Sequence, residues 1–526
     1  MKMRRHDALA VLACAVTLAV ATTAAAQNDP ALAARIERII SRPEFVHAMW
    51  GIEFYDADAM RPIYALNEQK LFTPGSTTKL LTAGTALQML GAAHRFHTKV
   101  YRTGPLTADG TLNGDLVLVA SGDPNLSQRL QPDGTLAFEN HDHAYGGAPD
   151  TKAVPGDPLM IIKRLVAQVK AKGVKRITGR VRVDATLFHE GTRELGSGVV
   201  VSPISVNDNV VDVSVAPGAT PGAPVALTVS PPNSYVRFVN KLTTGAGDSR
   251  PRVAIEDAIP AADSTVTVTV SGSVPALSTP VLYAYPVESP SRFAEVVLAD
   301  ALRAEGIAIS PTSAELTRNF ASLVASYIDA NVVAEHVSAP ATEMVKVILK
   351  VSQNMHASSM PLLMGALFGK ARQQNGFDVE REWLVQEGLD PRSAQQADGA
   401  GGDAHFTPAF MVSYLRMMSR RADFGAFKAA LPVLGRDGTL YQIQPKSPAA
   451  GHVFAKTGTY AVDDPLNQGL FVTAKGLAGY MTTSSGKQLI VVVYVNNVLV
   501  STAPDEVTRV VGQALGEVAA AAWEYR

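Results

Sequence analysis

Three short polar motifs, separated by long intervals, constrain the fold of this 526-residue chain more than any other feature. They are Ser76–Lys79 (Ser-Thr-Thr-Lys), Ser352–Asn354 (Ser-Gln-Asn) and Lys456–Gly458 (Lys-Thr-Gly), in that order. Each pattern is weak alone, because Ser-x-x-Lys recurs at Ser484 and Ser-x-Asn recurs at Ser205, whereas Lys-Thr-Gly occurs once. Order, spacing and setting therefore decide which copies carry function. The interval between the first two motifs is long enough to hold inserted domains.

The first motif is predicted to open a helix. It follows the helix-breaking stretch Thr73–Gly75 and begins an apolar run with helical spacing that ends at Gly91. Residues three apart on a helix lie one above the other, so the Ser76 hydroxyl is placed beside the Lys79 amine, at a helix N-terminus whose partial positive charge favours an anion. The sequence thus predicts an adjacent nucleophile and base. The copy at Ser484 lies between two strand-like apolar runs and predicts a hairpin turn instead.

The other two motifs are predicted at a helix junction and on a strand. Ser352 follows the apolar stretch 344–351, which places its hydroxyl and the Asn354 amide where one helix ends and another begins. The copy at Ser205 is interpreted as a polar turn entering a strand, with a structural role. Lys456 follows the apolar run 451–455, which predicts a strand, and Gly458 would let another extended backbone approach closely.

Together with three further stretches, these motifs resemble a known family. The further stretches are Ser121–Leu126, Asp398–Gly401 and Leu431–Leu440. The chain is similar to the penicillin-binding serine peptidases, and more closely to their class C low-molecular-mass branch, the D-alanyl-D-alanine carboxypeptidases and endopeptidases. The resemblance implies an α/β (α+β) fold. Its parts would be a penicillin-binding/β-lactamase-like catalytic domain, with an antiparallel sheet flanked by helices, and β-rich inserted domains.

The resemblance and the chemistry of the residues imply an acyl-enzyme on Ser76. A serine hydroxyl is a poor nucleophile until a base takes its proton, and a lysine can do so only when neutral, which burial and a nearby second cation both promote. Lys79 is the preferred base, and Lys456 is the expected second cation. Ser352 is expected to relay protons to the leaving group. β-Lactams would acylate the same serine oxygen.

The resemblance also implies how a substrate is held. Asn354 would hydrogen-bond the substrate backbone, and the backbone N–H groups of Ser76 and Thr459 would stabilise the developing oxyanion. A free carboxylate, the mark of a D-alanyl-D-alanine end, would meet Thr457, Thr459 and the charge of Lys456. The expected substrate-binding residues are Asn354, Lys456, Thr457, Gly458 and Thr459. No metal or other cofactor is implied.

Two stretches depart from the family pattern. Residues 355–358 are Met-His-Ala-Ser, where an aromatic residue and then an acidic one are expected, and residues 400–403 are Ala-Gly-Gly-Asp instead of Ser-Gly-Leu-Ser. The departures, His356 to Ser358 and Ala400 to Asp403, motivate one alternative, a catalytically weakened wall-binding homologue. A serine β-lactamase or esterase on the same scaffold is the other alternative. The favoured function is a serine-type D-alanyl-D-alanine carboxypeptidase and D,D-endopeptidase acting on peptidoglycan stem peptides.

The first 26 residues predict an export signal. A basic start, an apolar stretch and Ala24–Ala26 form a signal peptide with a cleavage site after Ala26, which predicts a periplasmic protein. Cys14, the only cysteine, lies within this segment, so the mature chain would form no disulfide. An uncleaved anchor is a less favoured reading, because the apolar segment is short for a membrane span. No stable membrane anchor is expected in the mature form.

The remaining chain is predicted to divide into a catalytic domain and two levels of insertion. The catalytic domain would comprise residues 27–93 and 333–526, and would include an amphipathic C-terminal helix packed against the catalytic sheet. The inserted domain would comprise residues 94–212 and 281–332, with a nested β domain at 213–280.

Composition and net charge limit the classes of molecule that the protein is expected to bind. Hydrophobic residues make up 47% of the chain and charged residues 18%, which indicates a globular, core-forming protein. A formal net charge of −1 implies no nucleic-acid partner. The expected partners are peptidoglycan peptides and, as covalent inhibitors, β-lactam antibiotics. His141-Asp142-His143 looks like a metal-site fragment, but it is predicted to lie in a polar loop without a third ligand at useful spacing.

Overall fold

The computed structural model describes residues 28–148, 150–249, 251–256, 259–261, 265–309, 319–370, 375–503 and 505–526. The predicted export signal, with its cleavage site at Ala26 and with Cys14, lies outside the described residues. Among the residues that are described, the search for a helix of membrane-spanning length and apolarity finds none.

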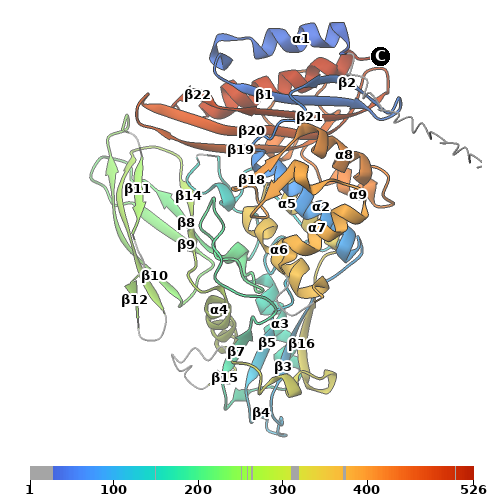
Figure 1. Ribbon diagram of the computed structural model, residues 1–526. Coiled ribbons are helices and arrows are strands. Elements are labelled where there is room, and N and C mark those ends of the chain that lie inside the picture. The colour runs from blue at the N-terminus through green and yellow to red at the C-terminus, as the bar shows by residue number, and fades with distance from the viewer. Residues whose placement is uncertain are drawn as a thin grey trace, which may run out of the picture.

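One antiparallel sheet joins the two ends of the chain (Figure 1). Its strands run in the order β19-β20-β21-β1-β2, and β22 pairs with the beginning of β20. The strands are β1 Met49–Asp56, β2 Arg61–Leu66, β19 Val453–Asp464, β20 Gly469–Thr482, β21 Gln488–Asn496 and β22 Val498–Ser501. Because β1 pairs with β21 along its whole length, the N-terminal segment is fixed within a sheet otherwise built from the last 75 or so described residues. The antiparallel sheet predicted for the catalytic domain is confirmed.

Helices cover both faces of this sheet. Alternate residues of a strand point to opposite faces, and in β21 Val491 and Val493 pack into one core while Val492 and Tyr494 pack into another. The first core lies under α1 (Pro30–Ile40) and the C-terminal α10 (Gln513–Ala520), which continues a π-helical turn at Val507–Gly512. The predicted packing of the C-terminal helix on the catalytic sheet is therefore confirmed.

The second core lies under the helices that carry the site. The helices are α2 Thr78–Leu90, α5 Ala341–Lys350, α6 Asn354–Phe368, α7 Gly376–Gln386, α8 Pro408–Met418 and α9 Phe424–Ala429, with the short strands β17 Ala394–Gln396 and β18 Ala404–Phe406 between α7 and α8. A 3₁₀ turn, η2 Gly75–Thr77, leads into α2, and Gly91 ends that helix in a backbone conformation with φ of 88°. The helix predicted from the first motif is confirmed at both ends.

The inserted region has its own hydrophobic core, built around two small sheets and two helices (Figure 1). One sheet has the order β16-β3-β5-β7 and the other β15-β6-β4. The elements are β3 His97–Arg102, β4 Thr111–Leu112, β5 Leu116–Val119, η3 His143–Tyr145, α3 Met160–Ala171, β6 Arg176–Ile177, β7 Val181–Asp184, α4 Pro290–Ala304, β15 Ala308–Ile309 and β16 Val332–Val337.

The nested β region is two further sheets. They have the orders β10-β13-β11, with β12 on β13, and β14-β8-β9. The elements are η4 Asn207–Asn209, β8 Val210–Ala216, β9 Ala226–Ser230, β10 Val236–Gly245, β11 Arg252–Ile255, β12 Ile259–Pro260, β13 Val266–Pro275 and β14 Val281–Pro286. Since β8 starts at Val210 and its partner β14 ends at Pro286, this sheet extends beyond the expected segment 213–280 at both ends.

A buried carboxyl in α7 gives the fold a pH dependence. Glu380 is 3% exposed, and burial raises the pKa of its carboxyl to about 8. The folded state therefore holds a proton that the unfolded chain releases at lower pH, so stability falls as pH rises from about 4.5 to about 8. We expect Glu380→Gln to leave the free energy of unfolding almost unchanged at pH 4.5 and to raise it at pH 8 by up to about 4 kcal/mol. Urea unfolding at the two pH values measures this difference, and an equal effect at both would contradict it.

Candidate active site

The N-terminal end of α2 and strand β19 meet at Ser76. Ser76 is half-buried in η2, and a Cβ added to Gly458 would lie 2.1 Å from the carbonyl oxygen of Pro74 and 3.0 Å from the Ser76 nitrogen. From the other side, a Cβ added to Gly75 would lie 2.8 Å from the Thr459 nitrogen. The backbone around Ser76 and the backbone around Thr459, far apart in sequence, are thus brought into close contact. Their proximity is what a pair of oxyanion donors requires.

Lys79 is fully buried and makes three polar contacts. Its Nζ lies 2.7 Å from Ser76 Oγ, 2.6 Å from Asn354 Oδ1 and 3.1 Å from the Ala400 carbonyl oxygen. A neutral amine has two hydrogens and one lone pair. The two carbonyl oxygens can only accept, so they take the hydrogens and the lone pair is left for the Ser76 hydroxyl. The contacts of Lys79 therefore match those of a base poised to remove the Ser76 proton.

The charge state of Lys79 suits this role. Burial lowers the pKa of Lys79 to about 7, although the nearby charges of Glu194 and Asp398 act in the opposite direction. About half of the molecules would therefore hold Lys79 as the free amine at neutral pH.

Two more buried lysines surround the site. Burial, the charge of Lys79 and then the charge of Lys475 lower the pKa of Lys456 well below its usual range, and burial lowers the pKa of Lys475 to about 8. Lys456 was expected to be the cation that keeps Lys79 neutral. The structure assigns the depression at Lys79 to burial, and the repulsion between the two amines falls on Lys456.

The second motif lies at the predicted junction between α5 and α6. Ser352 has a φ of 61° in the turn that joins the two helices, and Asn354 begins α6. The 2.6 Å contact of Asn354 Oδ1 with Lys79 is a role that the sequence did not predict, since only a substrate contact was expected there. Long separation in sequence explains why periodicity alone could not indicate it.

The third motif lies on β19, as predicted. Lys456 Nζ donates to the Thr457 carbonyl oxygen at 2.7 Å, and Thr457 Oγ1 donates to Thr439 Oγ1 at 2.7 Å. Thr459 is exposed, and its Oγ1 accepts a hydrogen bond from Lys475 Nζ at 2.7 Å. Lys475 is thus a cation at the site that no motif indicated.

The two stretches that depart from the family pattern keep ordered contacts. The Asp398 carboxylate accepts from the backbone nitrogens of Ala400, Gly401 and Asp403 at 2.6–2.7 Å, which shapes the loop whose Ala400 carbonyl reaches Lys79. Because that contact is made by backbone, the unusual side chains of this loop do not remove it. His356 is fully buried, and its Nε2 lies 3.0 Å from Asp208 Oδ1.

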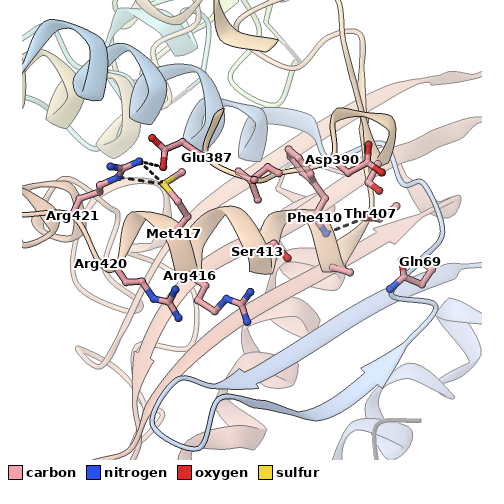
Figure 2. A pocket seen from close by; sticks show the side chains of 14 residues that line it. Gln69, Glu387, Asp390, Thr407, Phe410, Ser413, Arg416, Met417, Arg420 and Arg421 are labelled. Atoms are coloured by element: carbon pink, nitrogen blue, oxygen red, sulfur yellow. Dashed lines mark hydrogen bonds and ion pairs between the residues drawn. The ribbon is translucent and has the colours of Figure 1, made fainter. Parts of the chain in front are cut away.

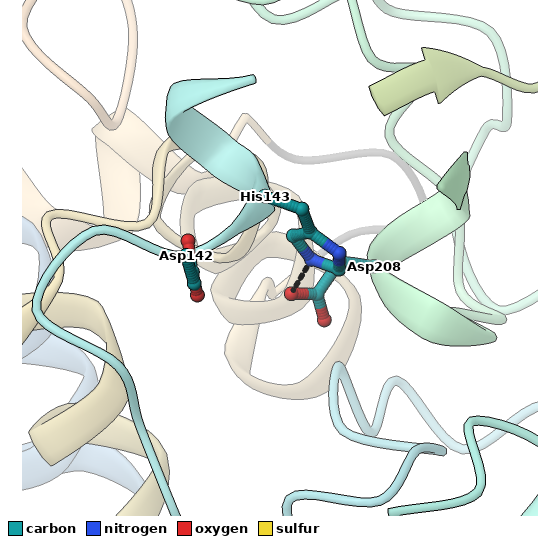
Figure 3. A group of neighbouring side chains, drawn as sticks. All are labelled: Asp142, His143 and Asp208. Carbon is teal, nitrogen blue, oxygen red and sulfur yellow. Dashed lines mark hydrogen bonds and ion pairs between the residues drawn. The ribbon is translucent and has the colours of Figure 1, made fainter. Parts of the chain in front are cut away.

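The metal-site fragment is not in a polar loop, as was expected, but buried. Asp142 and His143 are 0% and 6% exposed, and Asp208 completes a group of three possible metal ligands (Figure 3). However, Arg129 makes ion pairs with both carboxylates, at 2.7 Å in the case of Asp208. Both ring nitrogens of His143 also face carboxylate oxygens, at 2.8 Å from Asp208 and 3.0 Å from Asp212. Guanidinium and imidazolium groups thus balance these carboxylates, and the donor set does not fit an additional metal cation.

Two pockets lie near these elements. The larger, about 1330 Å³, is lined by Glu194 and Asp398, the two carboxylates that act on Lys79, and by Ser358. The smaller, about 600 Å³, runs along α8 and includes Arg416 and Arg420 but no described residue of the three motifs (Figure 2).

Comparison with known proteins agrees with this geometry. The chain is 27% identical over 447 residues to the D-alanyl-D-alanine carboxypeptidase of Actinomadura sp. strain R39, which covers 81% of this chain and 75% of that protein. It is 22% identical over 447 residues to the D-alanyl-D-alanine carboxypeptidase DacB of Haemophilus influenzae, covering 82% and 81%.

The solved structure of penicillin binding protein 4 (dacB) from Haemophilus influenzae has the same fold. The TM-score is 0.71 at 19% identity, and the match covers 93% of this chain and 99% of that one. A second structure of that protein, complexed with a β-lactam, has a TM-score of 0.65, with 19% identity and coverage of 92% and 97%. The penicillin-binding fold predicted from the sequence is confirmed. The sequence profile of one family matches residues 32–517, and the chain therefore belongs to the D-Ala-D-Ala carboxypeptidase 3 (S13) family.

Proposed function

We propose that the chain is a serine D-alanyl-D-alanine carboxypeptidase, and also a D,D-endopeptidase, that acts on peptidoglycan stem peptides through an acyl-enzyme on Ser76. The observation that carries the proposal is the contact set of Lys79, whose Nζ lies 2.7 Å from Ser76 Oγ, 2.6 Å from Asn354 Oδ1 and 3.1 Å from the Ala400 carbonyl oxygen. As a neutral amine, Lys79 can donate to the two carbonyl oxygens and accept from the Ser76 hydroxyl. Membership of the family supports the same reaction.

Acylation proceeds by attack of Ser76 on the carbonyl carbon of the penultimate D-alanine. Lys79 takes the hydroxyl proton as Oγ attacks, and the backbone nitrogens of Ser76 and Thr459 stabilise the oxyanion. The C–N bond then breaks, and the leaving amine receives a proton through Ser352. Water next attacks the ester carbonyl and gives a proton to Lys79, which is neutral again. The bond between Ser76 Oγ and the acyl carbon then breaks, and Lys79 returns that proton to Oγ. A β-lactam acylates the same oxygen, but its leaving nitrogen stays tethered.

The side of the site that carries Lys456, Lys475 and the two threonines selects a terminal carboxylate. Thr459 supplies a hydroxyl donor, because its Oγ1 accepts from Lys475 Nζ at 2.7 Å. The Thr457 hydroxyl, which donates to Thr439 in the free protein, would have to turn to the carboxylate. Lys456 and Lys475 add positive charge when protonated, which favours an anion here. A substrate with a free D-alanine carboxylate gives carboxypeptidase action. A cross-link whose leaving strand lies in the same place gives endopeptidase action.

The predicted signal peptide supports a periplasmic location, where the cell-wall substrate lies. Expression of the full chain and N-terminal sequencing of the periplasmic product tests this assignment. A mature N-terminus at Gln27 is expected.

The proposed reaction is tested with the purified chain, a peptide ending in D-alanyl-D-alanine, and a cross-linked muropeptide dimer. Mass spectrometry is expected to show loss of one alanine from the first and conversion of the second to monomers. Benzylpenicillin is expected to leave a long-lived adduct on the tryptic peptide that contains Ser76. Rapid penicillin turnover without peptide cleavage would instead identify a β-lactamase, and an adduct without peptide product would identify a weakened wall-binding homologue.

Gly458 gives a test of the oxyanion geometry. In Gly458→Ala the added Cβ would lie 2.1 Å from the Pro74 carbonyl oxygen, so β19 must move away from η2. We expect the rate of acylation by benzylpenicillin to fall about 10²- to 10³-fold, as when one oxyanion donor is lost. Gly425→Ala is the control, because Gly425 has open space around it and lies in α9. Equal rates in the two variants would contradict the close approach of strand and helix.

A further inference from the structure

The turn that carries Ser352 is strained and has to be held by its surroundings. A residue other than glycine rarely adopts a φ of 61°, and such conformations persist only where neighbouring groups fix them. Ser352 lies between Val351, which ends α5, and Gln353, which caps α6. The contacts of this turn therefore determine where Ser352 and Asn354 lie relative to Lys79.

One buried carboxylate of the inserted region contacts α6 twice. Asp208 Oδ2 accepts from Gln353 Nε2 at 3.1 Å, and its Oδ1 lies 3.0 Å from His356 Nε2. The two contacting side chains flank Asn354, whose Oδ1 is the 2.6 Å partner of Lys79. Asp208 is thus two side-chain contacts away from the lysine that is expected to activate Ser76.

Asp208 is itself held by two basic side chains of the inserted region. Its Oδ2 also accepts from Arg129 Nη2 at 2.7 Å and from His143 Nε2 at 2.8 Å, so four groups donate to a carboxylate that is 2% exposed. Three of the four donors share Oδ2, and His356 alone faces Oδ1, so Gln353 and His356 are held by different oxygens of the same carboxylate. Burial alone would raise the pKa of Asp208, but the charges of Arg129 and His356 and these hydrogen bonds hold it well below its usual range.

The short helix η3, which carries His143, also holds the α5 side of the Ser352 turn. Tyr145, two residues after His143 in η3, donates its hydroxyl to the Val351 carbonyl oxygen at 2.8 Å. Val351 and Gln353, the residues on either side of Ser352, are therefore both anchored to the inserted region. One of the family departures fits this picture, since His356 contacts the Asp208 carboxylate.

We propose that Asp208 is a positioning residue for catalysis, which holds the Ser352–Asn354 turn against Lys79 through Gln353 and His356 while Arg129 and His143 balance its charge. The proposal rests on the proposed roles of Ser352, Asn354 and Lys79. Asp208 does not touch the reacting atoms. Through Asp208 the inserted region affects catalysis indirectly. Its contacts keep the strained Ser352 turn in the conformation that places Ser352 and Asn354 near Lys79.

The test compares Asp208→Asn with Asp212→Asn. Both variants remove one buried carboxylate that faces His143. Among the described residues, however, the Asp212 carboxylate has polar contacts only with His143 and Asn207, at 3.0 and 3.2 Å, and none with α6. In Asp208→Asn an amide nitrogen replaces one acceptor oxygen and faces donors. His356 loses its partner if the nitrogen replaces Oδ1, and Gln353, Arg129 and His143 lose theirs if it replaces Oδ2. Misplacing catalytic groups by about 1 Å costs on the order of 10²-fold in rate.

The measurement is stopped-flow acylation by benzylpenicillin at saturating concentration, with the number of active sites titrated in the same samples. We expect the acylation rate constant per active site to fall about 10- to 100-fold in Asp208→Asn and less than about 3-fold in Asp212→Asn. A purely structural role would lower the number of active sites or the melting temperature and leave the rate constant of the surviving sites unchanged. Equal rate constants in the two variants would overturn the proposal.

A second pair of variants covers the case in which Asp208→Asn does not fold. Gln353→Leu and His356→Leu each remove one of the two contacts from the α6 side and leave Asp208, Arg129 and His143 in place. Each is expected to lower the same rate constant at least about 5-fold, and normal rates in both would overturn the proposal. If the wild-type chain is not acylated at Ser76, the proposed function itself fails, which is distinguishable from a normal wild type with unaffected variants.

Discussion

Ser76→Ala is expected to abolish peptide cleavage and penicillin labelling together. Without Oγ there is no atom to form the ester, and removal of the nucleophile from a comparable serine peptidase costs on the order of 10⁶-fold in kcat. We expect a fall of at least about 10⁵-fold in the release of alanine, measured by mass spectrometry of long incubations. Since Ser76 is only half-buried, the melting temperature is expected to change little.

The duplicate motif offers a matched control for this variant. Ser484 also begins a Ser-x-x-Lys sequence, but it is exposed in the turn between β20 and β21. Ser484→Ala is expected to retain wild-type cleavage and a full penicillin adduct. Persistent labelling of Ser76→Ala, or loss of activity in Ser484→Ala, would contradict the assignment of the nucleophile.

The part of the site that the sequence predicted is the part encoded locally. Ser76 and Lys79 are neighbours because helical residues three apart are neighbours, and the 2.7 Å contact follows from that periodicity. Gly458 was predicted to let the backbone of an extended peptide or lactam come close, and in the structure the backbone that approaches it is the protein's own, from Pro74 to Ser76. In each case the residue type and its immediate setting contain the necessary information.

The residues that the sequence did not indicate are joined by contacts across the chain. Asn354 and Ala400 reach Lys79 from 275 and 321 positions away, and Asp208 reaches His356 from 148 positions away. The turn at Ser205 was interpreted as structural, yet its neighbour Asp208 contacts the second motif. The polar residues around it, unusual in a buried turn, were the only signal. The third ligand-like group near His143 was missed for the same reason, since Asp208 lies 65 positions away.

In the fold, too, local features could be predicted from the sequence and long-range pairings could not. The antiparallel sheet and the amphipathic C-terminal helix packed on it were both predicted, because alternating and helical patterns are local properties of the sequence. The nested β region was predicted to exist, but its limits depend on which strands pair. Because β8 pairs with β14 across about 65 residues of intervening chain, composition could not place β14 within the same sheet.

Lys79→Met is expected to lower acylation by benzylpenicillin by about 10³- to 10⁴-fold and to remove its pH dependence near neutrality. The wild-type rate should rise with pH through about 7, where Lys79 loses its proton, and then level off. Methionine fills the buried site but has no lone pair of sufficient basicity, so no rising limb remains. Stopped-flow acylation from pH 5.5 to 9 measures both effects.

Lys79→Met should stabilise the fold although it lowers the acylation rate. A lysine whose pKa is about 7 in the folded state and near 10.5 when unfolded binds fewer protons on folding, so its cost to stability is greatest below pH 7 and disappears as pH approaches 10.5. Lys79→Met should therefore raise the melting temperature most at low pH. A base that is merely structural would give the stability change without the loss of rate.

Lys475→Met tests whether Lys79 or Lys475 causes the rise of the acylation rate with pH near 7. Lys475 is buried, its pKa is lowered to about 8, and it contacts Thr459, so its replacement is expected to weaken substrate binding. The rising limb near pH 7 should nevertheless persist in Lys475→Met, because Lys79 keeps its three contacts there. If the limb disappears in Lys475→Met and survives in Lys79→Met, the proton acceptor is on β20 rather than on α2, and the mechanism derived from the Lys79 contacts is wrong.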